Sequence, residues 1–378
     1  MRFSCTRDNL FQGLSVVSHA TGKNVHLPIL QNVLLRAAGG TVNLIATNLE
    51  VATRCFVRGK VEEEGEFTVP AKLFLDYVTL LPNENISVSS DGTSLSVQCG
   101  RNKTRINGLP STDFPVVPHV EGLQTFQIPV DGLRQALSRV LFAAATSEAR
   151  PELAGISVFF KRTEKGTELI LAATDSYRLA EASTSIVGQI DRETRAIIPA
   201  KTLAEVGRVL SVLRDSVESP SMIAMELSEN YVAFTHGSVE LISRTIEGTY
   251  PDYRQIIPQQ FRTSSILDRD DFAKAVKTAS LFSRSGLYEV SLAFHPSEKS
   301  MSVQSTDADR GENTAACSAD VSGDENAVTL NYRYLLDGLA ALGTERIRFS
   351  MIDASNPCTL RAEGEVDPYL YIIMPIKQ

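Results

Sequence analysis

Three copies of one pattern run along the chain, and this repetition constrains the fold more than any single motif does. The stretch LAATDSYRLAEA contains Thr174, and the similar stretches LIATNLEVATRC and SVQSTDADRGENTAA contain Thr47 and Thr306. The three threonines lie about 130 residues apart, a regular spacing that indicates repeated structural units. We therefore expect three copies of one fold.

A second set of repeats lies downstream of the first. The segments TVPAKLFLDYVTLL, IIPAKTLAEVGRVL and TLNYRYLLDGLAAL align on Lys72, Lys201 and Arg333. In each segment, apolar residues stand two and nine positions after the basic residue, an offset of two helical turns that predicts a helix buried on one side. Pro70 and Pro199 precede two of these helices, where proline is tolerated. The apolar pairs are Phe74 and Leu81, Leu203 and Leu210, and Leu335 and Leu342.

A third set of repeats lies upstream and predicts another helix in each copy. Its apolar residues follow i, i+4, i+7 spacing, and an aspartate stands two residues before each set, as a helix N-cap does. The aspartates are Asp8, Asp131 and Asp270, and the apolar residues are Leu10, Leu14 and Val17, then Leu133, Leu137 and Val140, then Phe272, Val276 and Ala279. Alternating segments between the helices, such as 41–45 and 168–171, predict strands.

The repeats predict an α+β fold with three similar domains. Proline-rich joints occur at DFPVVPHVEG and YPDYRQIIPQQF, where one copy ends and the next begins. We therefore expect domains at 1–120, 121–258 and 259–378.

Composition limits the compartment and the partners. The net charge of −8 disfavours a general polyanion binder, although one face of an acidic protein can still be basic. No apolar run is long enough for a membrane helix and no signal peptide is visible, so we expect a cytoplasmic protein with no membrane partner. The cysteines, which we expect to be reduced core residues, are Cys5, Cys55, Cys99, Cys317 and Cys358.

The usual signatures of an enzyme are not found in the sequence. No G-x-G and no G-x-S-x-G occurs, and the five histidines are too scattered to predict a metal site, so we expect no cofactor and no metal. Asp175 and Arg178 are the best candidates for acid–base catalysis. The repeat favours another interpretation, because Asp175 corresponds to Asn48 and Asp307 and so resembles recurring turn chemistry.

Several motifs together resemble the bacterial DNA polymerase III beta subunit family, the DNA polymerase sliding clamps. They are LPILQNVLL, TVPAK, INGLPSTDFP, TDSYRLA, YPDYRQIIP and the final YIIMPIKQ, and they occur in order along the whole chain. The resemblance implies a non-enzymatic processivity factor in DNA replication: a head-to-tail, ring-shaped homodimer of three clamp domains per chain that encircles duplex DNA without sequence specificity. It also implies a positive inner surface, to which the predicted helices would contribute Lys23, Lys72, Arg134, Lys201, Arg208, Lys274 and Arg333.

The resemblance implies three sets of functional residues. The replicative polymerase, the clamp loader and other replication and repair proteins would bind through short hydrophobic peptides at Leu153, Thr174, Ser176, Tyr177, Arg178, Leu179, Pro251, Ile256, Ile372, Met374, Pro375 and Ile376. DNA would be faced by Asn24, Lys72, Ser147, Lys201, Asn331 and Tyr334. The dimer would close through Ile106, Leu281 and Phe282.

Several positions depart from the family pattern. Asn24 and Ser147 stand where arginine and glutamine are common, Ser176 and Tyr177 replace glycine and histidine, and the chain ends in Ile-Lys-Gln. Two alternatives from other classes stay open at this point. One is a hydrolase or transferase that uses Asp175 or Asp307, and the other is a sequence-specific DNA binder, which the lack of a recognition-helix motif disfavours.

Overall fold

The structure is a computed structural model that describes residues 1–22, 27–120, 124–147, 149–164, 166–214, 219–284, 286–364 and 367–376. It divides into two compact units, each treated separately below. The first unit contains Met1–Asp131 and Glu205–Thr245, and the second contains Gly132–Ala204 and Ile246–Gln378. The middle repeat therefore contributes to both units.

The first repeat runs strand, helix, five strands, helix, three strands. Its elements are β1 (Arg2–Thr6), α1 (Arg7–Val17), β2 (Asn32–Ala38), β3 (Thr41–Thr47), β4 (Val51–Val57), β5 (Gly59–Glu63), β6 (Gly65–Pro70), α2 (Ala71–Thr79), β7 (Asn85–Ser90), β8 (Ser94–Cys99) and β9 (Asn102–Asn107). The short 3-10 helix η3 (Ser111–Asp113) follows in the linker.

The second and third repeats each run strand, helix, four strands, helix, three strands. The second contains β10 (Gln124–Pro129), α3 (Val130–Val140), β11 (Gly155–Thr163), β12 (Gly166–Thr174), β13 (Arg178–Ile186), β14 (Thr194–Pro199), α4 (Ala200–Val212), β15 (Met222–Leu227), β16 (Tyr231–His236) and β17 (Val239–Arg244), with η6 (Tyr253–Ile256) after it. The third contains β18 (Thr263–Asp268), α5 (Arg269–Ser280), β19 (Glu289–His295), β20 (Ser300–Asp307), β21 (Gly311–Gly323), β22 (Asn326–Asn331), α6 (Tyr332–Ala341), β23 (Arg346–Met351), β24 (Cys358–Ala362) and β25 (Leu370–Ile373).

The repeat extends to single backbone hydrogen bonds. After the last strand of each copy, one N–H donates to the carbonyl of the strand that precedes the second helix. The three bonds are Leu109 to Thr68 (3.1 Å), Ile246 to Ile197 (2.8 Å) and Ile376 to Thr329 (2.9 Å). The predicted α+β fold with three related copies is thereby confirmed.

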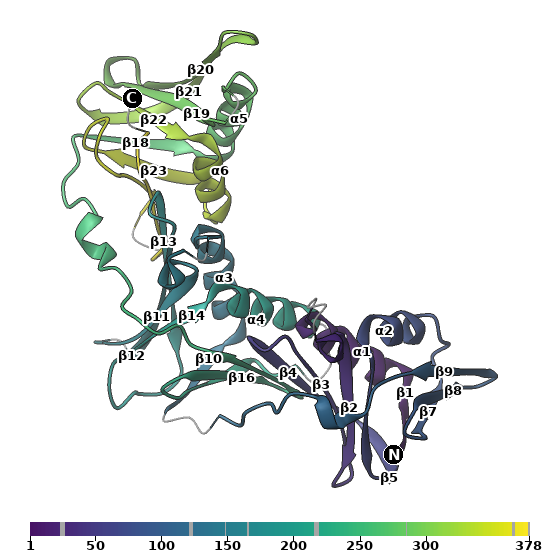
Figure 1. Ribbon diagram of the computed structural model, residues 1–378. Coiled ribbons are helices and arrows are strands. Elements are labelled where there is room, and N and C mark those ends of the chain that lie inside the picture. The colour runs from purple at the N-terminus through teal and green to yellow at the C-terminus, as the bar shows by residue number, and fades with distance from the viewer. Residues whose placement is uncertain are drawn as a thin grey trace. The chain divides into compact units, whose positions relative to one another are not determined.

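Two sheets build the first unit. One has the order β5-β1-β7-β8-β9, and the other runs β10-β15-β16-β17-β4-β3-β2-β6, so that strands of the first and second repeats form one continuous sheet (Figure 1). The joint is the antiparallel pair β17–β4, in which Val239 lies opposite Cys55 and Ser243 opposite Val51. Helices α1 and α2 lie side by side above this unit's sheets and cover its main core (Figure 1).

One twelve-stranded sheet organises the second unit, in the order β14-β11-β12-β13-β25-β24-β23-β18-β21-β20-β19-β22. Its joint is the antiparallel pair β13–β25, with Arg178 opposite Ile373 and Glu181 opposite Leu370. Helices α5 and α6 pack against each other and against β21 and β22 respectively (Figure 1). The two joints use equivalent strands of the repeat.

The predicted apolar stripes are confirmed, because all fifteen apolar residues named for the two helix sets are buried. The predicted N-caps are wrong. The hydroxyl of Thr6 caps α1 by accepting from the N–H of Asn9, and the carboxylate of Asp268 caps α5 by accepting from the N–H of Asp271. Asp8, Asp131 and Asp270 lie inside the first turn, where a negative charge interacts with the N-terminal end of the helix dipole.

Candidate functional site

The predicted Thr–Asx turn recurs with its Asx hydrogen bonds in all three copies, although the third turn is one residue longer: Thr306 lies opposite Glu312, six residues on, and the other two threonines lie opposite the residue five positions on. The Asx oxygen accepts from the N–H groups two and three residues later, at 3.0 and 2.8 Å for Asn48, 2.9 and 3.0 Å for Asp175, and 2.9 and 3.1 Å for Asp307. The hydroxyls of Thr47 and Thr174 donate to the carbonyl four residues later, at 3.0 and 2.6 Å. The interpretation of this pair as turn chemistry rather than acid–base chemistry is confirmed.

The second copy of the turn differs from the first in the side chain of Arg178. Its Nε donates to Asp175 at 3.0 Å, its Nη1 to Asp337 at 2.5 Å, and its Nη2 to the carbonyl of Phe142 at 2.5 Å. Asp337 belongs to α6, so this guanidinium ties the turn to a helix of the third repeat. Because each of its donor groups has an internal partner, Arg178 positions the turn.

Aromatic rings enclose the same guanidinium. The Arg178 Cζ atom lies 4.4 Å from the ring centroid of Tyr334 and 5.4 Å from that of Phe142. The backbone carbonyl of Tyr334 accepts a hydrogen bond of 2.8 Å from the hydroxyl of Tyr371, which stands on β25. The predicted DNA-facing residue Tyr334 therefore contacts the predicted peptide-binding residue Arg178, and the two predicted sites adjoin.

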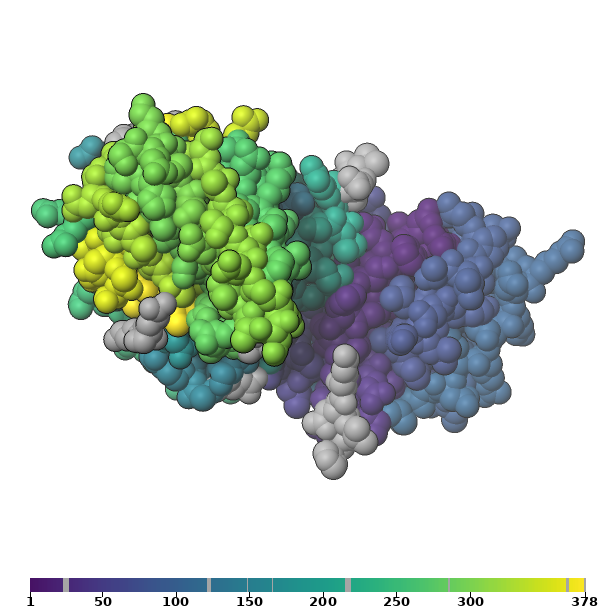
Figure 2. All heavy atoms as spheres, turned by 90° about the horizontal axis from the view of Figure 1, so that it is seen from above, coloured from purple at the N-terminus to yellow at the C-terminus, as the bar shows by residue number. Residues whose placement is uncertain are grey.

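The C-terminal segment lies against the second copy of the turn. Beyond the β13–β25 pairing, the N–H of Met374 donates to the carbonyl of Tyr177 at 2.9 Å. Figure 2 shows C-terminal residues, in yellow, at the surface directly beside teal residues of the second repeat. Residues almost 200 positions apart in the chain thus form one rim, and the structure brings the two predicted halves of the peptide site together.

The twelve residues of the predicted peptide site take three kinds of position. Buried residues form its floor, half-buried residues its sides, and exposed residues its rim. The buried residues are Leu153, Thr174, Leu179 and Ile372; the half-buried ones are Arg178, Pro251, Met374, Pro375 and Ile376; the exposed ones are Ser176, Tyr177 and Ile256. Ser176 has a positive φ of 77°, which turns the chain sharply at the rim.

The linker carrying η6 covers one side of the floor. Tyr253 and Ile257 pack against Leu179, Leu370 and Ile372. The Tyr253 hydroxyl donates to the Glu181 carboxylate, and burial together with that carboxylate raises the pKa of Tyr253. Asp337, Phe142 and Tyr253 are parts of this site that sequence reasoning missed.

The predicted DNA-facing residues occupy different surroundings. Lys72 and Lys201 are exposed at equivalent positions near the starts of α2 and α4, and Ser147 is exposed in a loop. Asn331 is the N-cap of α6, with its side chain accepting from the N–H of Arg333 at 2.9 Å. Asn24, like the adjacent Lys23, lies outside the described residues.

One cation predicted for the inner surface has a structural partner instead. Arg208 donates to both carboxylate oxygens of Glu205, to the carbonyl of Ser15 at 3.3 Å and to that of Val16 at 2.7 Å. These carbonyls belong to the last turn of α1, where unpaired acceptors favour a cation. Arg208 therefore joins α4 to α1, and its charge is paired within the chain.

The three predicted dimer residues also differ in exposure. Ile106 is only 5% exposed and belongs to the core of the first unit, where it lies opposite Leu95. Leu281, just after α5, is 66% exposed, and the neighbouring Phe282 is half-buried. Ile106 thus anchors β9 within its own chain, whereas Leu281 is a free apolar surface.

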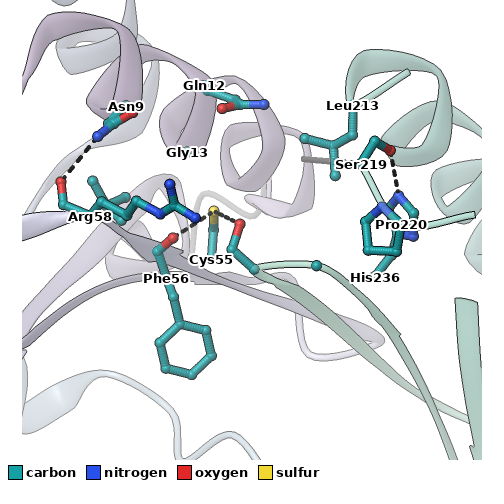
Figure 3. A pocket seen from close by; sticks show the side chains of 13 residues that line it. Asn9, Gln12, Gly13, Cys55, Phe56, Arg58, Leu213, Ser219, Pro220 and His236 are labelled. Atoms are coloured by element: carbon teal, nitrogen blue, oxygen red, sulfur yellow. Dashed lines mark hydrogen bonds between the residues drawn. The ribbon is translucent and has the colours of Figure 1, made fainter. Parts of the chain in front are cut away.

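A cavity of about 370 Å³ lies in the first unit between α1 and the β16–β17 turn (Figure 3). His236 is buried beside it, with Nε2 3.0 Å from the Ser219 hydroxyl and Nδ1 3.2 Å from the Met222 carbonyl, and burial lowers its pKa. Cys55 is also buried beside the cavity, and burial raises its pKa to about 11. These groups are neutral at pH 7 and offer no activated nucleophile.

The five cysteine thiols are buried, as core residues are. All five cysteines are free and buried, and burial raises the pKa of Cys5 and of Cys358 to about 12. Within the described ranges, no group of three His, Cys, Asp or Glu side chains is placed to hold a metal ion. None of the helices in the described part of the chain is long and apolar enough to span a membrane.

The fold and the sequence match one family of proteins. Three family models cover the chain in order: the N-terminal domain of the DNA polymerase III beta subunit at residues 1–118, the central domain at 127–252 and the C-terminal domain at 254–377. A non-catalytic protein of repeated clamp domains is the class that this fold defines.

Individual relatives agree over their full lengths. The beta sliding clamp of Synechocystis sp. is 29% identical, with 100% of this chain and 99% of that protein covered. The crystal structure of the Bacillus subtilis sliding clamp matches with a TM-score of 0.92 at 26% identity, covering 100% and 99% of the two chains. The sliding clamp from Bartonella birtlesii bound to griselimycin matches with a TM-score of 0.92 at 30% identity over 100% of both chains.

The chain belongs to the DNA polymerase III beta subunit family, the beta sliding clamps. It is a processivity factor for DNA polymerase and not an enzyme. The hydrolase or transferase alternative and the sequence-specific binder are both set aside by this result.

Proposed function

We propose that two copies of this chain close head to tail into a ring that encircles duplex DNA and tethers replication proteins through the rim around Tyr177. The observation that carries the proposal is the repeated strand joint. Two equivalent joints, β17–β4 and β13–β25, already connect successive repeats in equivalent register. A third joint of the same kind needs the strand equivalent to β25 in the first repeat and the strand equivalent to β13 in the third.

The two strands needed for a third joint each have an unpaired edge in the described chain. Strand β9 pairs with β8 alone, and residues 311–318 of β21 pair with β20 alone. Exposed strand edges are templates for pairing with another chain. Since one edge belongs to the first repeat and the other to the third, pairing between two copies is head to tail and closes after two joints. Leu281 adds apolar surface to this interface.

We further propose that the helices face the DNA and contact its phosphates. The six α-helices carry ten Lys and Arg residues against seven Asp and Glu residues, whereas the whole chain has 37 against 45. Lys72 and Lys201 are the strongest candidates because both are exposed at equivalent positions. Asn24, Ser147, Asn331 and Tyr334 complete the set. Phosphate contacts carry no sequence information, which suits a protein that slides.

Partner proteins, in this proposal, place a short hydrophobic peptide against the rim. Three observations support it: the buried apolar floor of Leu153, Leu179 and Ile372, the exposed Tyr177 and Ile256, and the polarizable Met374 at the side. Sliding clamps from Pseudomonas aeruginosa and Bartonella birtlesii have been crystallised bound to griselimycin, so members of this family accept a ligand.

We place the limits of the three domains at residues 1–120, 121–258 and 259–378.

The experiment that tests the ring uses circular DNA. The chain is loaded by its clamp loader onto a nicked circle, and the DNA is then cut once with a restriction enzyme. A closed ring held topologically remains bound to the circle at high salt and is released after linearisation. Retention that does not change on cutting contradicts the proposal, because it indicates attachment at a site.

A further inference from the structure

Each repeat has an equivalent position on the face of its sheet that points away from the helices. The residue two positions before the repeated threonine lies directly opposite a residue of the neighbouring strand. The three cross-strand pairs are Leu34 with Ile45, Ser157 with Ala172, and Ser291 with Gln304. Because the register is the same in each copy, these pairs mark the same place in all three domains.

The three copies of this position differ in what covers them. In the third repeat it is open: Ser291 and Gln304 line a cavity of about 420 Å³ together with Thr306. In the second repeat it adjoins Thr174, which belongs to the floor of the proposed peptide site. In the first repeat, the chain's own linker closes it.

The closing contact in the first repeat is an isolated apolar cluster. Phe114 and Val117 of the linker pack on Ile29, Leu34 and Ile45, and Phe114 is only 8% exposed. The cluster is separate from the main core, which takes the alternate residues of the same strands. An apolar floor in this copy is thus shielded from water by a segment of irregular chain and not by a strand or a helix.

The linker lies across this floor like a bound peptide. Its start is fixed by the Leu109–Thr68 backbone pair, and the N–H of Phe114 donates to the carbonyl of Ser111 at 3.0 Å. Phe114 and Val117 contact the floor, while Val116 between them is 94% exposed. An aromatic residue followed three positions later by an aliphatic one therefore suffices to fill the position.

We infer that residues 111–117 are an internal ligand that holds a latent peptide-binding groove of the first domain shut. The groove takes a short extended peptide with an aromatic and an aliphatic side chain at that spacing. The linker is covalently attached, so its effective concentration exceeds that of any free peptide, and the groove is unavailable to partners. This inference rests on the proposed function, in which partner peptides dock on the second domain.

The test truncates the side chain by which the linker holds the groove and then adds the linker sequence as a separate peptide. A labelled synthetic peptide of residues 111–120, STDFPVVPHV, is titrated against the wild-type full-length chain and against Phe114→Ala, and stoichiometry is measured by calorimetry. We expect F114A to bind one peptide more per chain than the wild type does. The added site should bind the same peptide with its phenylalanine replaced by alanine at least tenfold more weakly.

The controls separate the latent groove from the proposed peptide site. Val116→Ala should behave as the wild type, because Val116 does not contact the floor. In F114A combined with Ile256→Asp, which places a charge in the second-domain rim, the added site should persist. Its loss in this double variant, or an unchanged stoichiometry in F114A, overturns the inference. Failure of I256D to weaken polymerase stimulation would instead count against the proposed function.

A second measurement applies if F114A does not fold. In Phe114→Leu, we expect amide hydrogen exchange across residues 111–117 to rise at least tenfold while β2 and β3 stay protected. That result identifies the linker as a ligand that can leave a folded sheet. Equal acceleration of exchange in β2 and β3 overturns the inference, because it makes the linker part of the core.

Discussion

The β17–β4 joint and the β13–β25 joint share one backbone pattern but differ in the side chains around them. The first holds an ion pair of Arg54 with Glu240 across its paired strands. The second places Arg178 between two carboxylates and leaves Tyr177 64% exposed. The shared backbone pattern therefore joins successive repeats in both places, whereas the side chains of one copy of the turn diverge and form the rim at which we propose that partners bind.

A third joint of the same kind, formed between two chains, is the proposal's largest expected effect. In the known joints, the residue six positions after the repeated threonine lies opposite Leu241 or Tyr371. The turn of the third repeat is one residue longer, so the residue equivalent to Thr53 and Ala180 is Asn313, which lies opposite Ser305. The same register therefore places Asn313 opposite Thr104 of a second copy. We expect the double variant T104C/N313C to form an intermolecular disulfide in nearly all chains under mild oxidation, because directly opposed residues of antiparallel strands lie within bridging distance.

A control variant with the cysteine moved along β21 tests whether the disulfide requires the expected pairing of the two strands. Asn313 is left unchanged and cysteine is moved to Ala315, two residues along β21, while Thr104→Cys is kept. Little cross-linking is expected, as measured by non-reducing gel electrophoresis. Equal yields from the two pairs, or a yield that rises steeply with protein concentration, contradict a defined strand joint.

The last five residues set the second joint apart from the first, in which the chain continues into another domain. Deleting Met374 to Gln378 removes the backbone bonds from Met374 to Tyr177 and from Ile376 to Thr329. We expect stimulation of polymerase processivity to fall at least a hundredfold in primer-extension assays, while the dimer stays intact by light scattering. Loss of the dimer shows instead that these residues are structural.

The two arginines at the joints allow a matched comparison of stability. Removing Arg178 leaves Asp175 and Asp337 without their cation, so Arg178→Ala should lower the free energy of unfolding by about 3 kcal/mol, reduced from the fully buried case because Asp337 is partly exposed. Arg54→Ala removes one partly exposed ion pair and should cost about 1 kcal/mol. Urea unfolding followed by circular dichroism measures both, and equal costs would show that the second joint has no special network.

Among the features that are local in sequence, the helical stripes and the Thr–Asx turn were predicted well, whereas the N-caps of α1 and α5 were placed two residues too late. Helical stripes and the Thr–Asx turn depend on residues within a few positions of one another, and both are confirmed. The partners of Arg178 were not predictable, since Asp337 lies 159 positions away and only the folded sheet brings it near. For the same reason, the burial of Ile106 and the capture of Arg208 by the carbonyls of α1 follow from packing and not from any periodicity. The peptide, DNA and dimer assignments stay predictions.

Acid should distinguish the two joints, because the buried His236 at the end of β16 pairs with Val239 of the first joint and no histidine stands in the strands of the second. His236 is held neutral between Met222 and Ser219, and burial lowers its pKa from 6.5. In the unfolded chain this histidine takes up a proton near pH 6.5, whereas in the folded chain it resists doing so. The unfolded state therefore gains protons first, and the stability of the first unit falls as the pH drops from about 7.5 through 6.5 towards the folded pKa.

The second unit offers the internal reference for this effect, because neither 142–186 nor 346–376 contains a histidine. Hydrogen exchange measured at pH 7.5 and 5.5, after correction for intrinsic exchange rates, should show lower protection at the acid pH in β16, β17 and β4 but little change in β13 and β25. His236→Gln should remove the difference, since an amide replaces Nε2 without a titratable group. A pH dependence of the first joint that survives in this variant excludes His236 as its cause and assigns it to the carboxylates.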